Sequence, residues 1–210
     1  MWYALASCGG HGATRTPVPQ PTAPLPTATL AGQQVSLFPL TLLAAEDSLH
    51  WEAQLADRHA TLAKADSVIS TLIKARAPEV TWVLPQELRR AARRAPSVAT
   101  DPDQMGTALL RVESVEIVPD PLRSQLRTLE AIAGGRYALI PAALIYRRTV
   151  GLSDSRMDHP SAAAAAAELS VVMVDVRLGR VSWRTVARGE GNDPWSALTR
   201  AVKNLTPGLP

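Results

Sequence analysis

Hydrophobic residues fill most of segment 168–176, and they alternate with polar residues over 180–188. An extended first segment is apolar on both faces, with Leu169, Val171 and Met173 on one and Val172, Val174 and Val176 on the other. The second segment has one apolar face (Val181, Trp183, Thr185, Ala187) and one polar face (Ser182, Arg184, Arg188). Gly179 can adopt the positive φ of a tight turn between them. The pattern predicts a C-terminal β-hairpin over 168–188 whose first strand is central and whose second lies near a sheet edge.

Other apolar runs predict three strands, at 35–43, 81–84 and 136–148, with prolines at 39 and 141 as interruptions. Helical spacing predicts helices over 53–76 and from Pro85 onward. Three Asp-Pro pairs, at 101–102, 120–121 and 193–194, predict capped helices over 102–111, 121–133 and 194–205. We therefore expect an α/β (α+β) fold. It is a two-layer or three-layer sandwich, with helices packed on a mixed sheet of about five strands.

The composition fits one globular domain with tails, because the chain has 210 residues, 46% of them hydrophobic and 20% charged. The net charge is only +3. No apolar run is long enough to span a bilayer. Cys8 is the single cysteine, which excludes an internal disulfide and a multi-cysteine zinc site.

Leu5-Ala6-Ser7-Cys8 resembles the bacterial lipobox, in which a signal peptidase cleaves before the cysteine and the thiol carries diacylglycerol. The resemblance implies that Cys8 is the lipidation site. Only four residues precede this motif, so we expect a basic and apolar extension upstream that completes the signal peptide. The alternative is a free thiol in a cytosolic protein.

Residues 9–33 are rich in proline, threonine, alanine and glutamine and contain no acidic residue. Such a segment cannot bury enough apolar surface to fold, and an extended form would span about 75 Å. The expected organisation is a signal remnant with lipobox at 1–8, a flexible linker at 9–33 and a single α/β domain at 34–206. Gly9 stands where an inner-membrane retention signal would carry aspartate, which favours the outer membrane.

Four arginines, Arg89, Arg90, Arg93 and Arg94, share one face of the helix predicted from Pro85. This face is a candidate patch for a protein partner, acidic lipid headgroups or nucleic acid. The alternative is a solvated helix face. No aromatic residues interleave with the arginines, which argues against a binder of single-stranded nucleic acid.

Residues that could perform chemistry are scattered. His50 and His59, near Glu46, Asp47 and Glu52, are nine apart, which does not suit metal ligands on one helix face. Asp154, Asp158 and His159 lie in segment 151–167, which we interpret as a mobile connection between two strands. There is no glycine-rich phosphate loop, Gly-x-Ser-x-Gly motif or cysteine nucleophile, so we predict no enzyme, cofactor or metal. Asp175 is expected to accept hydrogen bonds from turn amides.

Three short motifs resemble a set of bacterial envelope proteins: Val35-Ser-Leu-Phe-Pro39, Tyr137-Ala-Leu-Ile, and the hairpin with Asp175, Gly179 and Trp183. The set comprises the curli-secretion lipoproteins, the lipoprotein activators of penicillin-binding proteins and the N-terminal domain of the Tol translocation protein. The resemblance covers roughly 34–205 and implies an α/β sandwich in the cell envelope, with no catalytic residue carried over. The chain lacks the Tol protein's propeller-like domain and the amphipathic membrane hairpins of the curli pore.

Three hypotheses follow. In the first, a non-catalytic lipoprotein is anchored through Cys8 at the periplasmic face of the outer membrane and binds an envelope protein through a sheet edge or the arginine face. In the second, the domain self-assembles or serves as an accessory subunit of a large membrane complex. In the third, Cys8 is not processed and the protein is a cytoplasmic enzyme or nucleic-acid binder.

Overall fold

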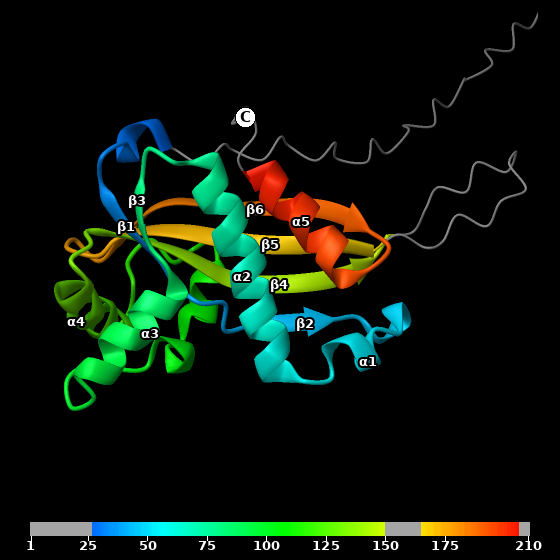
Figure 1. Ribbon diagram of the computed structural model, residues 1–210, viewed down its shortest axis with the longest axis horizontal. Helices are drawn as coiled ribbons and strands as arrows, with labels where there is room; N and C mark the ends of the chain where they lie inside the picture. The colour runs from blue at the N-terminus through cyan, green and yellow to red at the C-terminus, as the bar shows by residue number, and fades with distance from the viewer. Residues whose placement is uncertain (1–26, 150–164, 206–210) are drawn as a thin grey trace, which may run out of the picture.

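A computed structural model describes residues 27–149 and 165–205, which form one mixed six-stranded sheet (Figure 1). The strand order is β3-β1-β4-β5-β6, and β2 pairs with the second half of β4. β1, β2 and β3 run parallel to their neighbours, whereas β4, β5 and β6 are mutually antiparallel. The strands are β1 Gln34–Leu37, β2 Leu43–Ala45, β3 Thr81–Val83, β4 Tyr137–Arg148, β5 Ala165–Asp175 and β6 Arg180–Gly191.

Helices cover both faces of the sheet, so the predicted sandwich is confirmed in its three-layer form. α2 and α5 pack on one face, and α3 and α4 on the other (Figure 1). The helices are α1 Glu52–Leu55, α2 Arg58–Arg76, α3 Pro85–Arg94, α4 Leu122–Ala133 and α5 Pro194–Leu205. Four short 3-10 helices are η1 Thr27–Leu30, η2 Asp47–Leu49, η3 Pro102–Gln104 and η4 Thr107–Arg111. Among the described residues, no helix combines the length and apolar character that crossing a bilayer requires.

The C-terminal hairpin is confirmed, and it is longer than predicted. Alternate residues of β5 enter the two opposite cores, as expected for a strand covered on both faces. The prediction that Val181 and Trp183 share a face is wrong, because a bulge at Ser182 sets Met173 opposite Trp183 but Val174 opposite Val181. Trp183 therefore packs on the α2–α5 side of the sheet and Val181 on the α3–α4 side.

Two predicted elements are each divided in two. The apolar run 35–43 holds most of β1 and reaches only Leu43, the first residue of β2, because the chain leaves the first ladder before Pro39 and joins a later part of β4, giving six strands instead of about five. The helix predicted over 53–76 breaks at Asp57, whose Oδ1 accepts the N–H of Ala60 at 2.9 Å and so caps α2.

The three Asp-Pro pairs have different outcomes. Asp193 caps α5, because its Oδ1 accepts the N–H groups of Trp195 and Ser196 at 2.9 and 3.0 Å. Asp101 accepts the N–H of Asp103 at 3.1 Å, but two 3-10 helices follow it instead of the expected α-helix over 102–111. Asp120 makes no cap, and its carboxylate pairs with Arg123 at 3.0 Å.

The folded body begins earlier than residue 34. Leu30 is buried in the core, and the N–H of Gly32 donates to the carbonyl of Glu79 at 2.9 Å. The last seven residues of the predicted linker, 27–33, therefore belong to the domain. The rest of the linker and Cys8 lie outside the described residues. β5 begins at Ala165, so segment 151–167 is shorter than predicted, and its remainder also lies outside them.

α5 lies unusually close to β6 because two glycines face it. A Cβ added at Gly189 would come within 2.1 Å of the backbone nitrogen of Ala201. At Gly191 the nearest atom would be the backbone nitrogen of Ala197, at 2.4 Å. The strand and the helix thus meet backbone to backbone, with no room for a side chain at either position.

Candidate functional site

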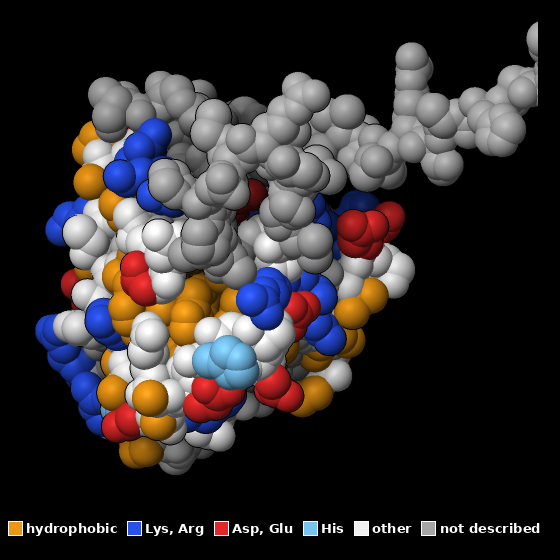
Figure 2. All heavy atoms as spheres, turned by 90° about the vertical axis from the view of Figure 1, so that its right-hand side faces the viewer, with side chains coloured by type: hydrophobic (Ala, Val, Ile, Leu, Met, Phe, Trp, Pro, Cys, Tyr) orange, Lys and Arg blue, Asp and Glu red, His pale blue; other side chains and the backbone are white. Residues whose placement is uncertain are grey.

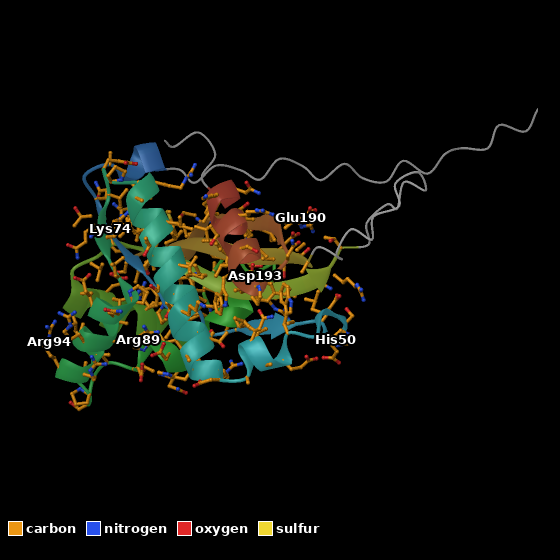
Figure 3. All side chains as sticks on the ribbon, turned by 45° about the vertical axis from the view of Figure 1, so that its right-hand side comes forward. His50, Lys74, Arg89, Arg94, Glu190 and Asp193 are labelled. Atoms are coloured by element: carbon orange, nitrogen blue, oxygen red, sulfur yellow. The ribbon has the colours of Figure 1, made fainter. Side chains whose placement is uncertain are left out.

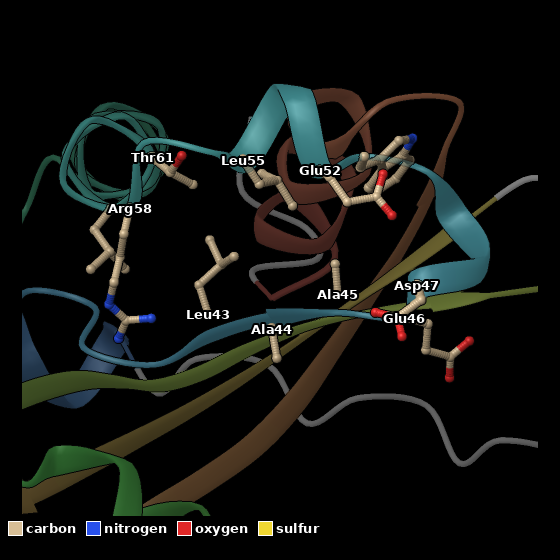
Figure 4. A pocket seen from close by; sticks show the side chains of 11 residues that line it. Leu43, Ala44, Ala45, Glu46, Asp47, Glu52, Leu55, Arg58 and Thr61 are labelled. Atoms are coloured by element: carbon tan, nitrogen blue, oxygen red, sulfur yellow. The ribbon is translucent and has the colours of Figure 1, made fainter.

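A groove lies between β2, α1 and the first turn of α2 (Figure 4). Its volume is ≈ 230 Å³. Small-molecule pockets usually occupy about 300–1,000 Å³, so this groove suits one or two side chains better than a ligand. It is lined by Leu43, Ala44, Ala45, Glu46, Asp47, Trp51, Glu52, Leu55, Arg58, Thr61 and Leu62.

The edge of β2 beside this groove is open. The carbonyl of Leu42 accepts from the N–H of Leu144 at 2.9 Å, and the N–H of Glu46 donates to the carbonyl of Tyr146 at 3.0 Å. Since backbone groups alternate in direction along a strand, Leu43 and Ala45 direct their N–H and C=O groups away from β4. Within the described chain, these four groups have no hydrogen-bond partner.

The two ends of the groove differ in charge. At one end, Arg58 donates through Nη2 to the carbonyl of Thr41 at 2.9 Å. At the other, Glu46 is engaged by Arg147 at 3.4 Å. Asp47 and Glu52 are exposed at the acidic end and form no ion pair with any residue that the structure describes. The end of the molecule that carries β2 and η2 shows apolar side chains bordered by charged ones (Figure 2).

The groove has a rigid aromatic wall. Trp51 packs edge-on against Tyr146, with ring centroids 5.3 Å apart and an interplanar angle of 78°. The Tyr146 hydroxyl donates to the carbonyl of Pro194 at 3.0 Å, and burial raises the pKa of this phenol. These contacts fix Trp51 in place, so the groove is formed before anything enters it.

The predicted arginine face is divided by the structure. Arg89 donates to Asp66 at 2.6 Å and to both carboxylate oxygens of Asp103 at 2.7 Å. Burial raises the pKa of Asp66, although the Leu40 N–H and Arg89 oppose it. Arg89 thus ties α3 to α2 and η3, while the other three arginines are exposed.

The positions of these groups are visible in Figure 3, where Arg89 lies toward α2 and Arg94 lies at the outer end of α3. His50 lies at the opposite end of the molecule from Arg94 (Figure 3). His50 and His59 are both exposed, and no group of metal-ligating side chains gathers anywhere in the described ranges. Asp154, Asp158 and His159 are outside these ranges.

Asp175 accepts two kinds of hydrogen bond at the hairpin turn. Its Oδ1 accepts the N–H of Leu178 at 3.0 Å, and its Oδ2 accepts Nη2 of Arg136 at 2.8 Å. Burial alone would raise the pKa of Asp175, but these hydrogen bonds lower it below the ordinary value. Gly179 completes the turn with a φ of 70°, and Trp183 is half-buried beyond it. The ion pair with Arg136 could not be read from the sequence, because 39 residues separate the partners.

Glu130 is a buried carboxyl that the sequence analysis did not identify. It is 3% exposed, and its Oε2 accepts the Ser36 hydroxyl at 2.9 Å. Its Oε1 has no hydrogen-bond partner among the described residues. Burial raises the pKa of Glu130 to about 7, although the Ser36 hydroxyl and the Gly135 N–H oppose it. The group is enclosed between α4 and the sheet, where its ionisation bears on the stability of the fold.

No family model and no curated protein matches the chain. Among solved structures it is similar to the LpoB C-terminal domain from Salmonella enterica, at 17% identity and a TM-score of 0.36, covering 77% of this chain and 83% of that one. It is also similar to a PelC dodecamer from Paraburkholderia phytofirmans, at 13% sequence identity and a TM-score of 0.39, covering 89% of this chain and 91% of that one. A third similar structure is lipoprotein GNA1162 from Neisseria meningitidis, at 12% sequence identity and a TM-score of 0.33, covering 75% of this chain and 80% of that one.

The Neisseria protein is named a lipoprotein, as are two of the groups that the sequence motifs resemble. With TM-scores of at most 0.39 and identities of at most 17%, the likenesses carry no argument about what this chain binds or does.

Proposed function

We propose that the protein is a non-catalytic, lipid-anchored component of the bacterial envelope whose α/β domain binds a protein partner. Cys8 carries the lipid, segment 9–26 is the tether, and the domain reaches its partner from the periplasmic face of the outer membrane. The alternative arrangement is a self-assembling or accessory subunit of a membrane complex.

One observation carries the interaction role: β2 presents unpaired backbone groups beside a preformed apolar groove. Open strand edges readily pair with other chains, because their N–H and C=O groups are free to form hydrogen bonds with an added strand. The edge of β2 is flanked by half-buried Leu43, Leu55 and Leu62, so a segment docked there would cover apolar surface as well as backbone.

The tether is supported by composition and by where the chain enters the domain. The proline-rich segment follows Cys8 directly, and Leu30 is the first of the described residues that is buried in the core. A segment that cannot fold by itself is suited to separate an anchor from a domain.

Mass spectrometry of the protein isolated from its native membranes tests the anchor. We expect loss of residues 1–7 and an added acyl mass on Cys8. An intact Met1 with an unmodified thiol would contradict the proposal and favour a cytoplasmic protein.

Cross-linking in intact cells, followed by light scattering of the purified protein, tests the interaction role. A cross-linked heterologous envelope protein and a monomeric mass support partner binding. A concentration-independent oligomer with no heterologous cross-link would instead favour the self-assembling subunit.

A further inference from the structure

The open edge of β2 defines the backbone geometry of whatever binds there. Leu43 and Ala45 offer two N–H donors and two C=O acceptors that point away from β4. An extended peptide supplies the complementary groups at the same spacing, and strand addition of this kind is a common mode of peptide recognition. A helix cannot do so, because its own backbone groups are already paired.

The groove defines the side chains of the occupant. Leu43 and Ala45 face the groove, together with Leu55 from α1 above them (Figure 4). Leu62 of α2 also lines the groove. An added strand would direct alternate side chains into the same space. A volume of ≈ 230 Å³ accommodates one or two large aliphatic side chains.

The acidic end of the groove determines the charge that the occupant should carry. Asp47 and Glu52 both line the groove and are exposed, and among described residues neither has an ionic partner. Glu46 is different, because Arg147 and the N–H of Arg148 already engage it. An arginine or lysine at the end of the docked segment would pair with these two carboxylates.

Resting on the function proposed above, we propose that this groove binds an extended, apolar segment of a protein partner that ends in a basic residue. The segment adds to β2 as a short strand, places its alternate aliphatic side chains between β2 and α1, and sets its arginine or lysine beside Asp47 and Glu52. A second folded copy fits less well, because it would have to bring its own three-residue β2, with α1 beside it, against the same narrow edge.

The probe is a labelled seven-residue peptide with a single arginine at its end, Thr-Thr-Leu-Thr-Leu-Thr-Arg with blocked ends, titrated against the full chain and followed by fluorescence anisotropy. Its counterpart has glutamate in place of arginine. We expect the basic peptide to bind about tenfold more tightly, from two exposed ion pairs gained and two repulsions avoided. In Asp47→Asn/Glu52→Gln this preference should fall to about twofold or less, whereas the matched variant Glu79→Gln/Glu113→Gln should keep it.

Backbone pairing is tested separately. Ala45→Pro removes an outward N–H without removing any hydrogen bond to β4, and we expect it to weaken binding about fivefold. Two peptides N-methylated at alternate positions provide the same test without altering the protein. The peptide methylated at the positions whose N–H groups face β2 should bind about fivefold more weakly. The other should bind as well as the unmethylated peptide, because only every second peptide N–H faces β2.

Equal binding of both methylated peptides, or equal binding of the basic and acidic peptides, would overturn the proposal. So would the absence of measurable binding at millimolar peptide. Self-association of the free protein that Ala45→Pro abolishes would assign the edge to a second copy and reject the peptide. None of these results affects acylation of Cys8 or cross-linking to a partner, so failure of this proposal is distinguishable from failure of the proposed function.

Discussion

Replacing Glu130 with glutamine should make the protein more stable at alkaline pH. The carboxyl of Glu130 is enclosed between α4 and the sheet and has no basic residue beside it. Only the Ser36 hydroxyl and the Gly135 N–H stabilise its ionised form. It also lies four residues before Gly134, the C-cap of α4, where the helix dipole disfavours negative charge. Ionisation therefore costs stability, and a neutral amide of the same shape removes that cost.

The size of the effect follows from the pKa of Glu130, which is about 7 in the folded protein against an ordinary value of 4.5. This difference corresponds to about 3 kcal/mol, since each factor of ten in the proton equilibrium is about 1.4 kcal/mol. The folded state holds the proton more tightly than the unfolded chain. The stability that the protonated Glu130 carboxyl contributes is thus fully present below pH 4.5 and is lost as the pH rises through about 7.

Urea denaturation of the wild type and Glu130→Gln between about pH 5 and pH 8.5 measures how the free energy of unfolding of each protein changes with pH. We expect the variant to gain about 2.5 kcal/mol on the wild type across this range, because the two proteins differ only in whether this carboxyl can ionise. Ser36→Ala removes a donor to the carboxylate, so it should move the loss of stability to higher pH without abolishing it. A difference between Glu130→Gln and the wild type that stays constant with pH would refute the reasoning.

Further predictions concern packing, a buried ion pair and a helix cap. Gly189→Ala would press a methyl group into the backbone of α5, and we expect a loss of about 2–3 kcal/mol by thermal denaturation; an unchanged Tm would show that the helix can move away freely. Asp66→Ala leaves the buried Leu40 N–H without its acceptor and removes one of the three Arg89 hydrogen bonds, so unfolding in urea should be easier by about 3 kcal/mol. Asp193→Ala should cost about 1 kcal/mol by the same assay, because it removes the cap of α5. Asp120→Ala, from the other Asp-Pro pair, should cost less than half of that, because its only described partner is the exposed Arg123.

Much of the fold could be predicted from local patterns. The hairpin turn at Gly179, the two-sided character of β5 and the start of α3 at Pro85 depend on residues close in sequence, and the structure has all three. The bulge at Ser182 could not be predicted, because it depends on the register with β5 and leaves the alternation of side chains in the sequence unchanged.

The candidate site was predicted less well, because its parts are distant in sequence. The sequence pattern places Leu43 at the end of one longer strand, and only pairing with β4, about a hundred residues later, makes β2 a separate element with an open edge. Helical spacing places Arg89 on one face with its arginine neighbours, although Asp66 and Asp103 hold it away from the exposed face. The burial of Glu130 could not be predicted from the sequence, because a polar residue in an amphipathic helix normally faces water.

The position of β4 in the sheet has a consequence for how the chain folds as it is made. β1 pairs with β4 across about a hundred residues, from Val35 to Tyr137, whereas β5, β6 and α5 contact one another within the last forty or so. Short-range contacts close quickly and long-range ones slowly. We expect the unit of β5, β6 and α5, about a fifth of the chain, to assemble first as a hairpin with its helix. The strands made earlier would then have no folded unit to pair with until it forms, and would need protection from aggregation in the meantime.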